Sequence, residues 1–149
     1  MTVRGIDHAG ITVASIATAL GFYRDLLGLR VTDEGEDGGP ELDAIVGVSG
    51  VRIRYAELDL GAGQLLEVIE YVAPEGTPLA QRPSDPGASH LALRVDDIDA
   101  LCSRLAAAGV TAAGQPTTIS APGAWHGARC VYVEDPDGRT VELIQHPPV

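Results

Sequence analysis

The chain has 149 residues, enough for one compact domain with a sizeable core, and its 45% hydrophobic and 21% charged residues are typical of an ordered globular protein. A formal net charge of -11, with ten scattered Lys and Arg residues, argues against binding to nucleic acid. No apolar run approaches the ~18–20 residues that cross a bilayer, so we expect a cytoplasmic protein with no membrane partner.

The first half predicts the order β, α, β, β, β. Ser15 precedes an amphipathic helix that Gly28 ends, and an acidic, glycine-rich loop is expected around 34–40. The expected strands, which alternate or are rich in β-branched residues, are 5–13, 29–33, 51–60 and 64–71. Residues 74–86 hold four of the ten prolines without periodicity and are expected to link two modules.

The second half predicts the same order. A helix should begin at the Asp96-Asp97 pair and end at Gly109, and a turn-rich segment should cover 114–127. The tight turn 135–138 should join the last two strands. The expected strands are 90–95, 110–113, 128–134 and 139–146.

The two halves also repeat particular residues. His8 in the first half matches His90 in the second, and Glu67 matches Glu142. We therefore expect a single α+β domain over 1–149, built from two tandem βαβββ modules at about 1–73 and 87–149. Their strands should form a curved, eight-stranded mixed sheet around a cavity.

The duplicated His and Glu residues predict a metal site. Strand alternation puts His8, Glu67, His90 and Glu142 on the faces away from the helices, beside the small Gly10 and Ala92. Two neutral imidazoles and two carboxylates suit a divalent ion and leave positions for a substrate with oxygens on adjacent carbons. Either Glu could then move a proton of the activated C–H group.

Other polar residues have plainer interpretations. A single His or Glu in a strand is usually structural, so the metal hypothesis depends on the repeated register of all four residues. Glu70 aligns with Gln145 and lies on the face opposite Glu67, which favours a structural role. Cys102 and Cys130 are expected to be reduced core residues, and His146 is expected at the surface.

Over nearly its whole length the chain resembles the vicinal oxygen chelate superfamily, which includes glyoxalases, bleomycin-resistance proteins and extradiol dioxygenases. The matching motifs are Ile6-Asp7-His8, the helix phrase 22–29, Ser89-His90-Leu91-Ala92, and 134–138 followed by Val141-Glu142-Leu143.

The resemblance implies one divalent ion (Ni, Co, Zn, Mn, Mg or Fe) bound by His8, Glu67, His90 and Glu142, with Glu142 or Glu67 as the acid/base. The ligand set is most like that of glyoxalase I. That enzyme carries an Arg and an Asn for glutathione where this chain has Thr12 and Tyr71, so lactoylglutathione is not expected as the substrate.

Three further residues are candidates for substrate binding. Arg94 shares the expected face of His90 and could hold an anionic group, with a structural ion pair as the alternative. Trp125 and His126 lie in a turn-rich segment that could form a lid or pocket wall, and His126 could assist proton transfer.

The sequence therefore favours a metal-dependent lyase or isomerase acting on a small, enolisable, oxygen-bearing substrate. The alternatives are an Fe(II) ring-cleaving dioxygenase, which typically uses two His and one Glu, and a drug-sequestering resistance protein without catalysis. A homodimer is expected, and the ion site could lie within one chain or across the dimer interface.

Overall fold

The computed structural model describes residues 2–148 and divides into two compact units between Pro78 and Leu79. Each unit contains one four-stranded mixed sheet, so the α+β class and the two βαβββ-like modules are confirmed. No helix in the described part of the chain is long and apolar enough to span a membrane.

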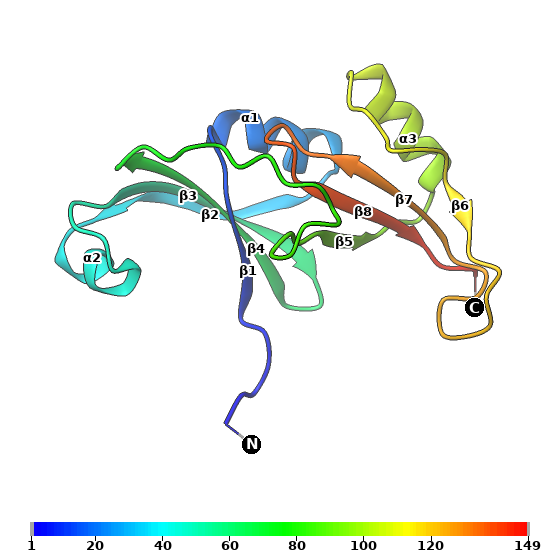
Figure 1. Cartoon of the computed structure of the whole chain (residues 1–149), viewed down its shortest axis with the longest axis horizontal. Helices are drawn as coiled ribbons and strands as arrows, with labels where there is room; N and C mark the ends of the chain where they lie inside the picture. The colour runs from blue at the N-terminus through cyan, green and yellow to red at the C-terminus, as the bar shows by residue number, and fades with distance from the viewer. Residues whose placement is uncertain (1, 149) are drawn as a thin grey trace. The chain divides into compact units, whose positions relative to one another are not determined.

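The first unit has the strand order β1-β4-β3-β2, with β1 parallel to β4 and the other pairs antiparallel (Figure 1). Its elements are β1 (His8–Thr12), α1 (Ile16–Leu20), the π-helical η1 (Gly21–Leu26), β2 (Arg30–Gly38), α2 (Pro40–Val46), β3 (Arg52–Gly61) and β4 (Gln64–Ala73). Leu66 and Val68 of β4 are fully buried. In η1, Tyr23 is fully buried and the side chain of Phe22 is 2% exposed. Burial of each such side chain contributes about 1.5–3 kcal/mol.

The second unit repeats this arrangement with the order β5-β8-β7-β6, in which only β5 and β8 are parallel. Its elements are β5 (Leu91–Arg94), α3 (Ile98–Ala107), β6 (Thr117–Thr118), β7 (Arg129–Glu134) and β8 (Thr140–Gln145). Val141 and Leu143 of β8 are fully buried, and so is Ile98 of α3. Each sheet therefore has one apolar face, and the opposite face is left for polar side chains.

The helix ends match between the units, as the sequence predicts. The Ser15 and Asp97 side chains accept hydrogen bonds from backbone N–H groups in the first turns of α1 and α3. Gly28 and Gly109 both follow the helical segments with a φ of 81°, a conformation that favours glycine.

One prediction for the first unit is wrong, and one helix was not predicted. The segment 34–40 is not a loop, because β2 extends to Gly38 and pairs with β3 along its length. Salt bridges across the strands, such as Arg30–Asp59 at 2.7 Å, replace the apolar alternation that strand prediction depends on. Helix α2 was not predicted, because seven residues show no useful periodicity; its signals are Pro40 in the first turn and left-handed Gly47 after the end.

The expected strand at 110–113 is also wrong. Only an isolated bridge joins Ala112 to Val133, and the third strand of the second unit is the short β6. The Val110 N–H donates to the Leu105 carbonyl and so completes the end of α3, which removes it from strand pairing.

Candidate metal and substrate site

In the first unit, strand pairing brings His8 and Glu67 together. His8 opens β1 and pairs with Leu65 of the parallel strand β4, while Gly10 lies opposite Glu67. The His8 Nε2 atom lies 3.4 Å from Glu67 Oε2. A Cβ atom at position 10 would lie 3.7 Å from that oxygen, so the glycine leaves space beside the carboxylate.

Asp7 orients the His8 ring. Its Oδ1 atom lies 2.9 Å from His8 Nδ1, which leaves Nε2 directed at Glu67. This hydrogen bond raises the pKa of His8, and the negative charge of Glu67 adds to the increase, while partial burial opposes it. A carboxylate behind the imidazole is the usual arrangement for a metal-binding His, because it fixes the ring and increases its basicity.

The second unit contains the equivalent pair. His90 immediately precedes β5, and its Nε2 atom lies 3.2 Å from Glu142 Oε2. Ala92 lies opposite Glu142 on one side, as Gly10 lies opposite Glu67, and Tyr132 lies opposite Glu142 on the other. The rings of His90 and Tyr132 are 5.5 Å apart.

These pairs have the chemistry and spacing of metal ligands. Two donors about 2.1 Å from one ion, at angles of ~90–110°, lie about 3.0–3.4 Å apart. The two imidazoles are 46% and 45% exposed and remain accessible, whereas the carboxylates are 26% and 17% exposed. In the described part of the chain neither unit gathers three such side chains by itself, so each offers two of the four expected ligands.

The competing carboxylate Glu70 is structural, as predicted. Its Oε2 atom accepts a hydrogen bond from the N–H of Ile16 at the start of α1, and Oε1 accepts one from Arg54. The aligned Gln145 accepts in the same way from Ile98 N at the start of α3. The internal repeat thus includes the polar contacts that join each helix to its sheet.

Arg94 keeps the position predicted for it. It follows His90 and Ala92 on the same face of β5, and its side chain is exposed. Within residues 2–148 it forms no hydrogen bond or ion pair, which argues against the structural alternative.

Trp125 and His126 have partners outside the His90–Glu142 pair. The Trp125 ring lies 5.8 Å from the ring of His146, which is half-buried and not simply at the surface as expected. The His126 ring N–H donates to the carbonyl oxygen of Ser120 within the same loop. Their proposed contact with substrate stays a prediction.

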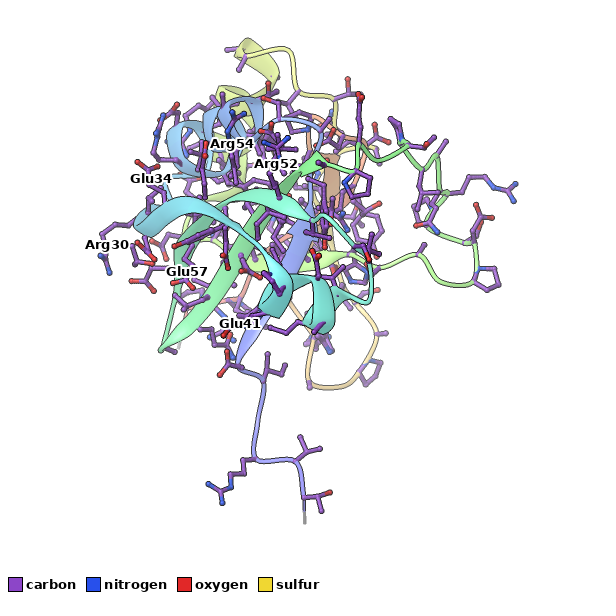
Figure 2. The ribbon with its side chains drawn as sticks, turned by 90° about the vertical axis from the view of Figure 1, so that its left-hand side faces the viewer. Arg30, Glu34, Glu41, Arg52, Arg54 and Glu57 are labelled. Atoms are coloured by element: carbon purple, nitrogen blue, oxygen red, sulfur yellow. The ribbon has the colours of Figure 1, made fainter. Side chains whose placement is uncertain are left out.

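Sequence reasoning did not single out the residues opposite the two ligand carboxylates. Glu57 of β3 lies opposite Glu67, and Tyr132 of β7 lies opposite Glu142 (Figure 2 labels Glu57). The sequence contains the information needed to find them. The short turns before β4 and β8 fix the register of each hairpin, and the register determines which residue lies opposite each Glu.

Both cysteines are free, as predicted, but each is half-buried and not in the core. Cys130 lies on the same face as Tyr132 and Glu142. Burial raises the pKa of its thiol, and the charge of Glu142 and its hydrogen bond with the thiol raise it further.

Comparison with known proteins identifies the family. Residues 5–143 match the model of the Glyoxalase/Bleomycin resistance protein/Dioxygenase superfamily. The chain belongs to this superfamily. It is 36% identical to a 2-epi-5-epi-valiolone epimerase of Actinomyces sp., over 99% of this chain and 85% of that protein.

Other relatives are less similar in sequence. The lactoylglutathione lyase of Haemophilus influenzae is 28% identical over 95% of this chain and 92% of the enzyme. The crystal structure of a glyoxalase family protein from Bacillus cereus superposes with a TM-score of 0.85 at 19% identity, covering 99% of both chains, which supports the fold alone.

Proposed function

We propose that this superfamily member is a metal-dependent isomerase or lyase acting on a small, enolisable substrate with oxygens on adjacent carbons. The observation that supports it most is the repeated His–Glu pair at ligand spacing, 3.4 Å in one unit and 3.2 Å in the other. The 36% identity to an epimerase favours isomerisation. Thr12 and Tyr71, in place of the residues that glyoxalase I uses for glutathione, argue against a glutathione adduct.

His8, Glu67, His90 and Glu142 are the proposed ligands of one divalent ion, from Ni, Co, Zn, Mn, Mg or Fe, in the cavity that the sequence predicts. Such an ion supplies Lewis acidity that lowers the pKa of the C–H group beside a carbonyl. Two neutral imidazoles and two carboxylates balance its charge, so an anionic oxygen can approach without strong repulsion. The expected homodimer, and exchange of modules between chains, stay predictions.

Glu142 and Glu67 are the proposed acid and base. One carboxylate takes the proton of the C–H bond, and the bond's electron pair moves toward the carbonyl oxygen as an enolate forms. The other carboxylate, after taking up a proton from solvent, gives that proton to the opposite face of the carbon. This regenerates the carbonyl with inverted configuration, and the first Glu releases its proton to solvent.

Arg94, Trp125 and His126 are the proposed substrate-binding residues. The exposed, unpaired guanidinium of Arg94, on the face of His90, is available for a carboxylate or another anionic oxygen. Trp125 is 47% exposed in the loop and offers an apolar surface, and the nearby His126 could relay a proton.

The test is a substrate screen with metal-loaded protein in D2O, with NMR used to detect deuterium entering the C–H position. Glu142→Gln should lower exchange by about 10²- to 10⁴-fold, the usual contribution of a general acid or base. The matched control Glu70→Gln changes the structural carboxylate and should stay within about threefold of wild type. Undiminished exchange in Glu142→Gln would remove the proposed role.

Two other outcomes would redirect the assignment. Oxygen consumption with a catechol would indicate a dioxygenase, and tight drug binding by metal-free protein would indicate sequestration. Elemental analysis should give about one ion per four-ligand site.

A further inference from the structure

The two proposed histidine ligands differ in what holds their rings. In the first unit the Asp7 carboxylate lies 2.9 Å from His8 Nδ1. In the second unit Ser89 precedes the histidine, and within residues 2–148 no hydrogen bond or ion pair joins His90 Nδ1 to a carboxylate or carbonyl oxygen. In this part of the chain the His90 side chain interacts with Glu142, at Nε2, and with the ring of Tyr132.

Tyr132 packs against the ring of His90. The ring centroids are 5.5 Å apart and the ring planes are inclined at 36°. This distance is within the range of about 4.5–7 Å for paired aromatic rings, and the inclination is closer to stacking than to an edge-to-face arrangement. The lone pair or proton of Nε2 lies in the plane of the imidazole, so packing on the ring does not compete with a group bound at Nε2. The tyrosine ring therefore limits rotation of the imidazole and leaves its ligand atom available.

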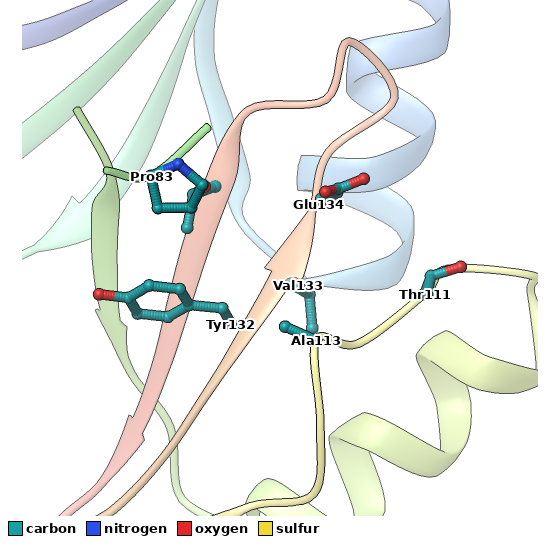
Figure 3. Close-up of a pocket in the computed structure, with 7 residues that line it drawn as sticks. Pro83, Thr111, Ala113, Tyr132, Val133 and Glu134 are labelled. Carbon is teal, nitrogen blue, oxygen red and sulfur yellow. The ribbon is translucent and has the colours of Figure 1, made fainter. Parts of the chain in front are cut away.

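The backbone of Tyr132 is fixed in the middle of β7. It lies opposite Glu142 of β8, and its carbonyl oxygen accepts a hydrogen bond from the Ala113 N–H at 2.8 Å on the other side. The adjacent Val133 is 1% exposed and anchors the strand in the core. Tyr132 and Pro83 line the same small, mostly apolar pocket of about 100 Å³ (Figure 3). The tyrosine ring thus has the rigid, apolar support that a group orienting a ligand needs.

The hydroxyl group of Tyr132 does not contribute to this support. Within residues 2–148 it forms no hydrogen bond. In the first unit the matching position is Glu57, which has no ring to pack against His8. Each unit therefore has one of two devices, a carboxylate for His8 and an aromatic ring for His90.

We propose that Tyr132 is a positioning residue that holds the imidazole of His90 in the orientation for metal binding, as Asp7 does for His8. The inference rests on the proposed function, because His90 is one of the proposed ligands of the ion. An exposed imidazole without such a partner samples several orientations, and binding then selects one of them at a cost in affinity. The ring of Tyr132 removes part of that cost.

The first test measures the affinity for Zn²⁺ by competition with a chelating indicator. Tyr132→Leu removes the ring and should weaken binding about tenfold, at the lower end of the range for groups that orient a ligand. Tyr132→Phe keeps the ring and should stay within twofold of wild type. Tyr132→Met, which also removes the ring, replaces Tyr132→Leu if that variant does not fold.

A matched control makes the same chemical change elsewhere. Tyr55 is a half-buried tyrosine in a strand of the first unit, and within the described residues its ring packs against no histidine. Tyr55→Leu should therefore keep the affinity for Zn²⁺ within twofold of wild type. An equal loss in Tyr55→Leu and Tyr132→Leu would overturn the inference.

A rescue experiment separates positioning from a general structural role. Ser89 precedes His90 as Asp7 precedes His8, so Ser89→Asp supplies the carboxylate that the second unit lacks. Added to Tyr132→Leu, it should recover most of the lost affinity, whereas in the wild-type background it should change the affinity by no more than about twofold. An equal gain in both backgrounds would show an effect of charge alone and would overturn the inference.

A further measurement needs no metal. NMR relaxation of the His90 ring C–H groups in metal-free protein should show greater mobility in Tyr132→Leu, wild-type mobility in Tyr132→Phe, and partial recovery after addition of Ser89→Asp. Unchanged mobility in Tyr132→Leu, or equal changes in the Leu and Phe variants, would overturn the inference. Wild-type protein that binds no Zn²⁺ but loses His90 order in Tyr132→Leu would retain the positioning role and refute the proposed ion.

Discussion

The two units place the same pair of proposed metal ligands, one His and one Glu, in different surroundings. Glu67 lies between Gly10 and Glu57, whereas Glu142 lies between Ala92 and Tyr132. The ligand pair is thus duplicated, and the residues across from it are not. The duplicated part fits a task shared by both halves, holding an ion, and the divergent part fits recognition of an asymmetric substrate.

The divergence extends along both sheets. In the first unit, position 59 is an Asp paired with Arg30, while the matching position in the second unit is Glu134, which forms no ion pair in the described chain. Thr12 in the first unit likewise corresponds to the exposed Arg94. The second unit therefore has more unpaired polar side chains, Glu134 and Arg94, that are available to a substrate. In the first unit the carboxylate at the position of Glu134 is already paired, and Glu67 lies close to a second carboxylate, Glu57.

The largest expected effect tests whether the cores are equivalent. Leu66→Ala and Leu143→Ala, one in each unit and both fully buried, should each lower the free energy of unfolding by about 2–5 kcal/mol because each leaves a cavity. Denaturant titration measures this. The exposed Val48→Ala should change it by less than about 0.5 kcal/mol, and a core variant indistinguishable from that control would contradict the equivalence.

The next effect tests whether the ligands are equivalent. His8→Ala and His90→Ala should each weaken metal affinity by at least about 100-fold, beyond the 10- to 100-fold range of outer-shell partners. Asp7→Asn should fall within that range, because Asp7 only orients His8. Competition with a chelator measures all three, and a loss confined to one His would show that the halves do not share an ion.

A smaller effect tests the contacts between helix and sheet. Glu70→Ala and Gln145→Ala should each lower the free energy of unfolding by about 1–2 kcal/mol, because each leaves a helix N–H without its acceptor. Glu70→Gln retains an acceptor and should recover part of the loss in thermal unfolding. If Glu70→Ala is destabilising and Gln145→Ala is not, the important contact is the salt bridge between Glu70 and Arg54. The hydrogen bond to the helix N–H, which both units have, would then contribute little.

The smallest effect concerns pH. Arg129 of β7 donates to the Asp99 carboxylate of α3 at 2.6 and 2.9 Å and lowers the pKa of Asp99, while Arg24 lowers the pKa of the adjacent Asp25. A lowered folded-state pKa gives stabilisation that is complete above the unfolded value of about 3.9 and disappears as the pH falls through the folded value.

Of these two ion pairs, only the one between Asp99 and Arg129 joins residues that are distant in sequence. Asp25 and Arg24 are neighbours in the unfolded chain as well. Asp99→Asn should therefore reduce stability at pH 7 and have no effect at a pH below the folded pKa, whereas Asp25→Asn should change little at either. Thermal unfolding across this pH range measures the difference, and equal pH dependence of the two variants would contradict it.

Much of the fold was predictable because its signals are local. Ser15, Gly28, Asp97 and Gly109 mark helix ends through backbone requirements that operate within one turn. Strand β2 was underestimated because its charged residues are paired with β3, a contact that periodicity within β2 cannot reveal. Strand β6 was misplaced because the end of α3 uses the N–H of Val110.

The two His–Glu contacts were predictable only through the repeat. Neither His8 nor Glu67 alone is unusual, but the same types recur in register at His90 and Glu142. Tyr132 has no counterpart in the first unit, where Glu57 occupies the matching position, so comparison of the halves could not reveal it. Its position opposite Glu142 depends on pairing between β7 and β8.

The parallel pairing of β1 with β4, and of β5 with β8, determines when each His can meet its Glu during synthesis. His8 is on the first strand of its sheet and Glu67 on the last to be synthesised, and His90 and Glu142 are separated in the same way. During translation the imidazole therefore emerges long before its carboxylate, and nothing brings the two together until the intervening hairpin has formed. Binding of the proposed ion should consequently follow the folding of both halves.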